Sequence, residues 1–259
     1  MSDRAAHLEL EARHAAEALF HDHKYTTGST YPRHYRANPT APVFDRLMSL
    51  VGEDLSNLNV LEYGCGTGWI TTQLARRGAS VSAFDIAPTA VAETRQALAA
   101  ANLLQACDVR VMGGERLLYP DNSMDVAIGF AILHHLDLGP ALSELRRVLK
   151  PGGRALFAEP LASNPLIRLY RHLTPQFRTV DEEPLDLDRF ARRLEGFSKF
   201  QHHEQLLLAS SALALCYVPG LSGFAGSVQR LLMKVDDALL RAVPRMGKWA
   251  WYSILVFEK

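Results

Sequence analysis

The stretch "VLEYGCGTGW", Val60 to Trp69, decides how this chain folds. An apolar run typical of a β-strand passes directly into three glycines, Gly64, Gly66 and Gly68, and then into a helical pattern. Glycines at this spacing allow backbone torsions that a Cβ forbids, and they let a ligand approach the main chain closely. The stretch therefore predicts either a ligand-binding loop or a tight strand–helix turn without a ligand.

Acidic residues on both sides of this loop favour a ligand. Asp85 ends the next predicted strand, seventeen residues after Gly68. A carboxylate there can accept hydrogen bonds from both hydroxyls of a ribose, although a strand-end Asp also commonly caps the following helix. Glu62 stands directly before the loop, where its charge would repel a pyrophosphate and suit a cation. The combination predicts a site for a positively charged nucleoside.

Strand-like segments alternate with helical patterns between residues 43 and 160, which is typical of an α/β fold with mostly parallel strands. Two further strand-like segments follow near the C-terminal end of the sequence. The seven segments are 59–64, 80–86, 108–112, 124–130, 154–160, 197–205 and 249–259.

Composition limits the function further. Lys plus Arg equals Asp plus Glu at 28 each, so no net field attracts a nucleic acid. Three widely spaced cysteines form neither a metal knuckle nor a disulfide framework. The first residues lack the apolar core of a signal peptide, and the longest apolar run, Leu206 to Val218, is shorter than the about 20 residues of a membrane span. We expect a cytoplasmic protein without a nucleic-acid partner or stable membrane insertion; the oligomeric state is not indicated.

Several motifs of the sequence resemble those of a known family. "VLEYGCGTGW" resembles motif I of the class I S-adenosylmethionine-dependent methyltransferases, which has an acid two residues before G-x-G-x-G. Residues 113–136 and 141–153 resemble the later motifs of the ubiquinone/menaquinone-biosynthesis type, methyltransferase type 11. The resemblance covers about residues 43 to 160. It implies a doubly wound, mostly parallel seven-stranded Rossmann-like sheet with an antiparallel C-terminal strand.

The same resemblance implies which residues bind S-adenosylmethionine. Ile86 is expected to pack on the adenine. The family commonly has Asp-Ala-Glu where this chain has Gly113, Gly114 and Glu115, so the backbone of Gly114 or the side chain of Glu115 is expected to replace the usual acid. Cys65 is expected to pack rather than to act as a nucleophile. The predicted donor-binding residues are Tyr35, Glu62, Gly64, Cys65, Gly66, Gly68, Asp85, Ile86, Gly114, Glu115 and Phe130.

Candidate catalytic residues follow two predicted strands. His134 and His135 come after the fourth strand, and Glu159 ends the fifth. Ligands of an open parallel sheet bind outside the carboxyl ends of its strands, so these side chains should face the acceptor. A histidine suits deprotonation of a hydroxyl, and His135 is the first choice. A structural role for the histidines, or transfer without a general base, is the alternative. His202 and His203 are further candidates.

No metal site is predicted. His7, His14 and His21 lie seven residues apart on a predicted helix, so consecutive members are about 10 Å apart and too distant to share one ion. They are interpreted as a solvated or partner-facing stripe. The histidines of "HDHKY" and "QHHEQ" lack Asp or Cys partners at ligand spacing.

The predicted organisation has a cap and an insertion. Residues 1–42 form an N-terminal helix, over about residues 4–22, and a cap segment; residues 43–259 form the methyltransferase domain. Residues 206–248 join two strands that a hairpin of two to five residues could connect. We expect a helical lid lining a hydrophobic acceptor pocket; helices simply packed on the sheet, or docking on a membrane surface, are the alternatives.

The expected function is in-line methyl transfer from S-adenosylmethionine to a small, partly apolar acceptor, most simply at a hydroxyl oxygen. Carbon or nitrogen transfer to a quinone-like, lipid or glycan acceptor and a non-catalytic binding module are alternatives. Methylation of RNA or protein is disfavoured, because "GFAILHHL" stands where an N-P-P-Y-type motif would follow strand four.

Overall fold

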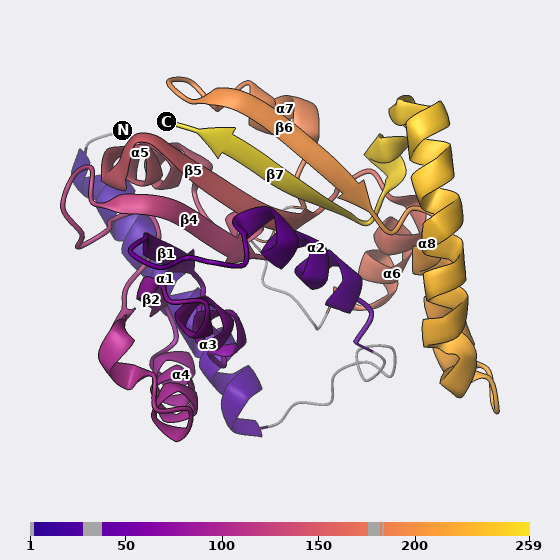
Figure 1. Ribbon diagram of the computed structural model, residues 1–259, viewed down its shortest axis with the longest axis horizontal. Helices are drawn as coiled ribbons and strands as arrows, with labels where there is room; N and C mark the ends of the chain where they lie inside the picture. Colours follow the sequence, from indigo (N-terminus) through magenta and orange to yellow (C-terminus); the bar gives the residue numbers. More distant parts are fainter. Residues whose placement is uncertain (1–2, 28–37, 176–181, 183) are drawn as a thin grey trace.

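The structure is a computed structural model that describes residues 3–27, 38–175, 182 and 184–259. Its centre is a seven-stranded sheet in the order β3-β2-β1-β4-β5-β7-β6 (Figure 1). Strand β7 pairs antiparallel with β5 and with β6, and the other pairs are parallel. This confirms the predicted sheet. The strands are β1 Asn59–Tyr63, β2 Ser80–Asp85, β3 Cys107–Val111, β4 Met124–Phe130, β5 Leu149–Pro160, β6 Ser198–Gln205 and β7 Tyr252–Glu258.

Helices cover both faces of the sheet. Neighbouring residues of a strand point to opposite faces: in β5, Leu156 belongs to the core cluster that includes residues of α2, α3 and α4, whereas Phe157 belongs to the cluster that includes residues of α5 and α7. The α-helices are α1 Asp3–Thr27, α2 Ala41–Val51, α3 Trp69–Arg76, α4 Pro88–Ala100, α5 Leu138–Val148, α6 Pro165–Leu173, α7 Leu187–Ala191 and α8 Ala225–Ala242. The short 3-10 helices are η2 Leu104–Ala106, η3 Leu133–His135, η5 Ala209–Tyr217, η6 Ser222–Phe224 and η7 Pro244–Trp249.

The insertion between β6 and β7 consists of η5, η6, α8 and η7. In Figure 1, α8 lies beyond the ends to which β4 and β5 point. Asp236 of α8 is 3% exposed and accepts hydrogen bonds from the backbone nitrogens of Leu208 and Ala209, which fixes η5 on α8. Gln229 of the same helix donates to the carbonyl of Pro39, just before α2. The insertion is thus anchored by polar contacts at the carboxyl edge of the sheet; its role as a lid stays a prediction.

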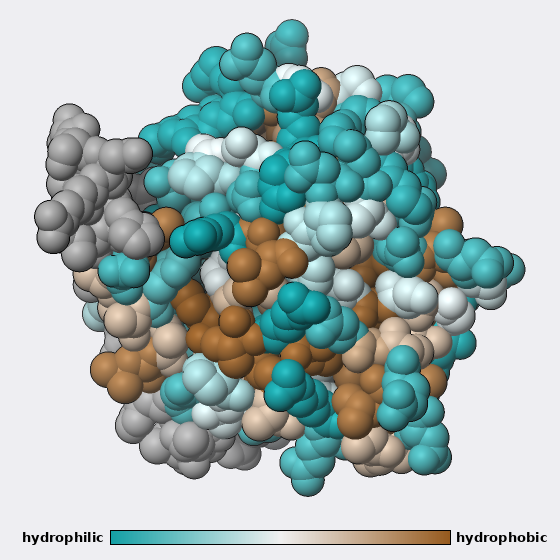
Figure 2. Space-filling view, turned by 90° about the vertical axis from the view of Figure 1, so that its left-hand side faces the viewer, coloured by the Kyte–Doolittle hydropathy of each residue, from teal (hydrophilic) through white to brown (hydrophobic). Residues whose placement is uncertain are grey.

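The surface carries apolar as well as polar side chains. On the face in Figure 2, hydrophilic residues dominate the upper part, and brown hydrophobic surface runs across the middle. Among the exposed apolar side chains, Leu118 is 61% exposed, Phe224 61% and Leu231 63%. Within the described ranges, none of the helices combines the length and the hydrophobicity needed to cross a bilayer.

The turn after β1 takes the conformation that its glycines predict. Gly64, Gly66 and Gly68 have φ of 71°, 52° and 80°. These values lie in the left-handed region that a residue with a Cβ enters only at a cost of about 1–2 kcal/mol. At Gly68 a Cβ would also lie 2.9 Å from the Cα of Thr94, on α4. The turn therefore requires glycine for backbone torsion and for close packing of the loop on α4.

We predict that Gly68→Ala lowers the free energy of unfolding by about 1–3 kcal/mol more than Gly152→Ala does, because only the first change adds overpacking to backbone strain. Gly152 is a matched control, with a φ of 76° and no atom within 4 Å of an added Cβ. Urea denaturation of both variants measures the difference. Equal losses would contradict the steric part of this account.

Candidate active site

Glu62 is a buried carboxyl at the start of the glycine turn. It is 1% exposed, and its Oε2 accepts a hydrogen bond from the hydroxyl of Thr71 at 2.6 Å. Burial raises the pKa of this carboxyl to about 8; the Thr71 hydrogen bond opposes the shift, and the negative charge of Asp85 adds to it. A nearby cation would stabilise the ionised form of such a buried carboxyl and lower its pKa.

Asp85 joins the glycine turn to the loop after β2. One carboxylate oxygen accepts from the backbone nitrogen of Gly66 at 3.0 Å, and the other from that of Ala87 at 3.0 Å. Each oxygen has a second lone pair, so the carboxylate can still accept from ligand hydroxyls. The residue that caps α4 is Ala87, so Asp85 does not serve as its N-cap.

Three other predicted donor residues lie on this edge of the sheet. Cys65 is 4% exposed, and burial raises the pKa of its thiol far above the ordinary value, which makes it a packing residue. Ile86 and Phe130 are half-buried at the carboxyl ends of β2 and β4. The ring of Phe130 lies 5.6 Å from that of Tyr252. Tyr35 lies outside the described residues, and its role stays a prediction.

Residues 113–115 contact α1. Glu115 is 6% exposed; its carboxylate hydrogen-bonds Nε2 of His14 at 2.9 Å and accepts from the backbone nitrogen of Asp137 at 3.0 Å. Burial alone would raise the pKa of Glu115, but these hydrogen bonds hold it below its ordinary value. A side chain at Gly113 would collide with the ring of His14. The departure from the family pattern at Gly113 therefore makes room for α1, and an adenine contact by Gly114 or Glu115 stays a prediction.

Glu159 and His134 form a buried pair after β4. Glu159 has no exposed surface, and its Oε1 accepts from the backbone nitrogens of Ile132 and Leu133 at 2.9 and 2.8 Å. Its Oε2 lies 2.7 Å from Nδ1 of His134. The other ring nitrogen, Nε2, lies 3.9 Å from a carboxylate oxygen of Glu182. A carboxylate on Nδ1 fixes the tautomer and leaves Nε2 as the atom that can exchange a proton.

Glu182 links this pair to α6. Burial raises the pKa of its carboxyl, but the neighbouring His134 ring and the guanidinium of Arg171 lower it below the ordinary value overall. Arg171 donates to both the carboxylate and the backbone carbonyl of Glu182. Neither residue was among the predicted site residues, because nothing local in their sequence marks them.

His135 faces α1. Its Nδ1 lies 3.4 Å from Oε2 of Glu17, and its ring lies 5.3 Å from that of His21. Arg13, also on α1, donates to the backbone carbonyl of His135 at 2.7 Å. The interpretation of the α1 histidines as a solvated or partner-facing stripe is wrong for His14 and His21, whose side chains are 26% and 20% exposed and contact the chain's own acids.

His202 and His203 are not brought to this site. Both lie on β6, the edge strand, which β7 and β5 separate from β4. The hydrogen bond to Glu204 raises the pKa of His202, whereas burial lowers that of His203.

Comparison with known proteins agrees with this geometry. Residues 61–157 match the Methyltransf_11 family model, described as a methyltransferase domain. The chain is similar to a malonyl-[acyl-carrier protein] O-methyltransferase of Erwinia billingiae, at 31% identity over 62% of this chain and 61% of that protein. It is also similar to a ubiquinone/menaquinone biosynthesis C-methyltransferase of Geotalea daltonii, at 31% identity over 45% of this chain and 51% of that protein.

The chain spans 24% to 61% of the length of the first curated relatives that it matches. Among solved structures, it is similar to geranyl diphosphate C-methyltransferase of Streptomyces coelicolor A3(2), with a TM-score of 0.61 and 14% identity over 84% of this chain and 78% of the other. That likeness shows the fold alone. The sheet order is that of the class I S-adenosylmethionine-dependent methyltransferase fold, and the match to the Methyltransf_11 family holds for residues 61–157.

Proposed function

We propose that this protein transfers a methyl group from S-adenosylmethionine to a small, partly apolar acceptor, at a hydroxyl oxygen. The observation that carries the proposal is the pair of acids around the glycine turn. Glu62 is buried with a raised pKa, and Asp85 is held against the backbone of Gly66. A ligand with an ammonium for one acid and ribose hydroxyls for the other satisfies both, and S-adenosylmethionine carries these groups.

The reaction is an in-line displacement. The acceptor oxygen bonds to the methyl carbon while the carbon–sulfur bond breaks, and the bonding electrons remain on sulfur to give neutral S-adenosylhomocysteine. The hydroxyl proton goes to Nε2 of His134, because Nδ1 is bonded to Glu159. Glu159 then stabilises the imidazolium that forms, as a carboxylate oriented toward a histidine does in other general bases. Positioning supplies the rest of the acceleration.

His135 is a second candidate base. Its side chain is 14% exposed, compared with 6% for His134, and it lies one residue further along the same turn. The arrangement favours His134, because its ring is fixed by a full hydrogen bond, whereas His135 Nδ1 has only the 3.4 Å contact with Glu17 among the ion pairs found in the described residues. This order differs from the expectation from the sequence, which put His135 first.

The insertion supports an apolar acceptor. Leu206 and Ala209 are buried in the same cluster as Trp251 and Tyr252, against which Phe130 packs at the end of β4. Apolar residues of η5, η6 and α8 also remain at the surface, among them Tyr217, Phe224 and Leu231. An acceptor with apolar parts could be covered by this segment, in agreement with a lid. A helical pair that only packs on the sheet is the alternative.

Carbon transfer is the second candidate chemistry, because both an O-methyltransferase and a C-methyltransferase are among the similar proteins. A binding module that retains the donor site without turnover is the third. Release of S-adenosylhomocysteine with a panel of phenols, prenyl alcohols and hydroxylated fatty acids, followed by mass analysis of the product, separates the three.

We predict that S-adenosylmethionine binds more tightly as the pH rises from about 5 to about 8. In the free protein the pKa of Glu62 is about 8, so its carboxyl is protonated below that pH. The ammonium of the donor favours the ionised form, so binding releases a proton and affinity increases by up to about tenfold per pH unit. Calorimetry at several pH values, in buffers of different ionisation enthalpy, measures affinity and proton release.

Glu62→Gln is the matched control for this pH dependence. It keeps the size of the side chain and cannot titrate, so its affinity should be weaker at pH 8 and nearly independent of pH below it. A pH slope equal to that of the wild type would show that Glu62 does not face the donor cation.

We predict that His134→Ala lowers turnover by about 10² to 10⁴ while donor affinity changes little, because a general base acts in the transition state. Glu159→Gln should give a smaller loss and shift the acidic limb of the pH–rate profile. His135→Ala is the comparison: if it lowers turnover more than His134→Ala, the two roles are exchanged. Unchanged turnover in both variants would make the histidines structural.

A further inference from the structure

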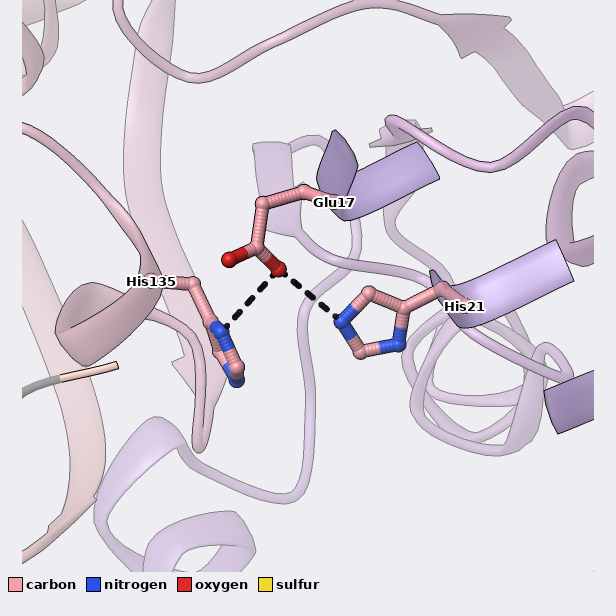
Figure 3. A group of neighbouring side chains, drawn as sticks. All are labelled: Glu17, His21 and His135. Atoms are coloured by element: carbon pink, nitrogen blue, oxygen red, sulfur yellow. Dashed lines mark ion pairs between the residues drawn. The ribbon is translucent and has the colours of Figure 1, made fainter. Parts of the chain in front are cut away.

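Three potential metal ligands from distant parts of the chain meet beside the candidate active site. Glu17 and His21 lie one helical turn apart on α1, and His135 follows β4 (Figure 3). Oε2 of Glu17 lies 3.4 Å from Nε2 of His21 and 3.4 Å from Nδ1 of His135. All three ligand atoms lie within 4.8 Å of one another. Figure 3 shows the carboxylate between the two rings.

These distances fit shared coordination better than hydrogen bonding. Hydrogen bonds from N–H to oxygen are most often 2.9–3.0 Å long and rarely exceed about 3.2 Å. Two ligands of a tetrahedral Zn²⁺, at about 2.0–2.1 Å for nitrogen and 2.0–2.2 Å for oxygen, lie about 3.3–3.5 Å from each other. The two nitrogen–oxygen distances at Glu17 match the second spacing.

The environment of the three side chains also suits an ion. Glu17 is 4% exposed, and the side chains of His21 and His135 are 20% and 14% exposed. Nδ1 of His135 is buried and makes no hydrogen bond to any residue that the structure describes. A buried ring nitrogen without such a bond is an available ligand atom, and neutral imidazole is a common ligand of transition metals.

A neighbouring group is a weaker candidate. His134, His135 and Glu182 also bring ligand atoms together. However, Glu182 is already paired with the guanidinium of Arg171. A second cation at Glu182 would be repelled by that guanidinium. The group around Glu17 is therefore favoured.

We propose that Glu17, His21 and His135 bind one divalent ion of the zinc class, with the fourth position open to water. Two imidazoles and a carboxylate, all on one side of the ion, are a common ligand set for Zn²⁺. Glu17 and His21 share a face of α1 because residues four apart lie one above the other. The ion would join α1 to the turn after β4 across 114 residues of chain. The site does not depend on methyl transfer, and it would engage Nδ1 of His135.

The test is metal binding by the full chain without a histidine tag. After treatment with a chelator and dialysis against Zn²⁺, bound metal is measured by mass spectrometry; Co²⁺ in its place reports tetrahedral geometry by visible absorption. The wild type should retain about one equivalent and unfold at a higher temperature with the ion than without it, because binding to the folded state alone stabilises it. Glu17→Gln and His21→Gln should lose both effects.

His202→Gln is the matched control, because it removes a half-exposed histidine beside Glu204 on β6 and leaves the cluster intact. It should bind as the wild type does. Circular dichroism establishes that each variant is folded, and two independent ligand variants keep the result interpretable if one is not. Undiminished binding in both ligand variants, no binding by the wild type, or binding of Mg²⁺ alone would each overturn the proposal.

Discussion

The fully buried carboxylate of Glu159 determines the shape of the candidate active site. It accepts two backbone hydrogen bonds from the turn after β4 and bonds the ring of His134. An ionised group without exposed surface is tolerated only when its lone pairs are satisfied, and here three donors do so. Ile132, in the turn that Glu159 holds, packs against Gly64. A Cβ added at Gly64 would lie 2.9 Å from the side chain of Ile132. One carboxylate thus connects the glycine turn, the histidines and β5.

Helix α1 is the second element on which the site depends. Three of its polar contacts fall on segments that follow the carboxyl ends of parallel strands. Asp22 accepts from the backbone nitrogen of Thr89 after β2, His14 bonds Glu115 after β3, and Arg13 reaches His135 after β4. The helix therefore crosses the edge where ligands of such sheets bind.

In the proposed function, donor and acceptor bind to different parts of the chain. The predicted donor residues Glu62, Gly64, Gly66, Gly68 and Asp85 lie on β1, β2 and the turn after β1, within the segment that matches the methyltransferase family. The segments around the proposed acceptor position, α1, α6 and the insertion with α8, lie outside residues 61–157. Related domains can therefore share a donor and differ in acceptor. The polar anchors of α8, Asp236 and Gln229, are the specific contacts that hold the insertion in place.

The sequence by itself determined the sheet and the glycine turn, because strand–helix alternation and the torsions of Gly64, Gly66 and Gly68 are local properties of the chain. It also placed Glu62, Asp85 and Glu159 at strand ends, where the topology of a parallel sheet brings them to one edge. The cluster of Glu17, His21 and His135 was decided only by tertiary structure. Spacing along α1 argues against an ion shared by His14 and His21, but no local pattern reveals that a helix will dock its face on a turn 114 residues away. That docking depends on side-chain complementarity, such as the space that Gly113 leaves for His14, and complementarity exists only once the chain has folded.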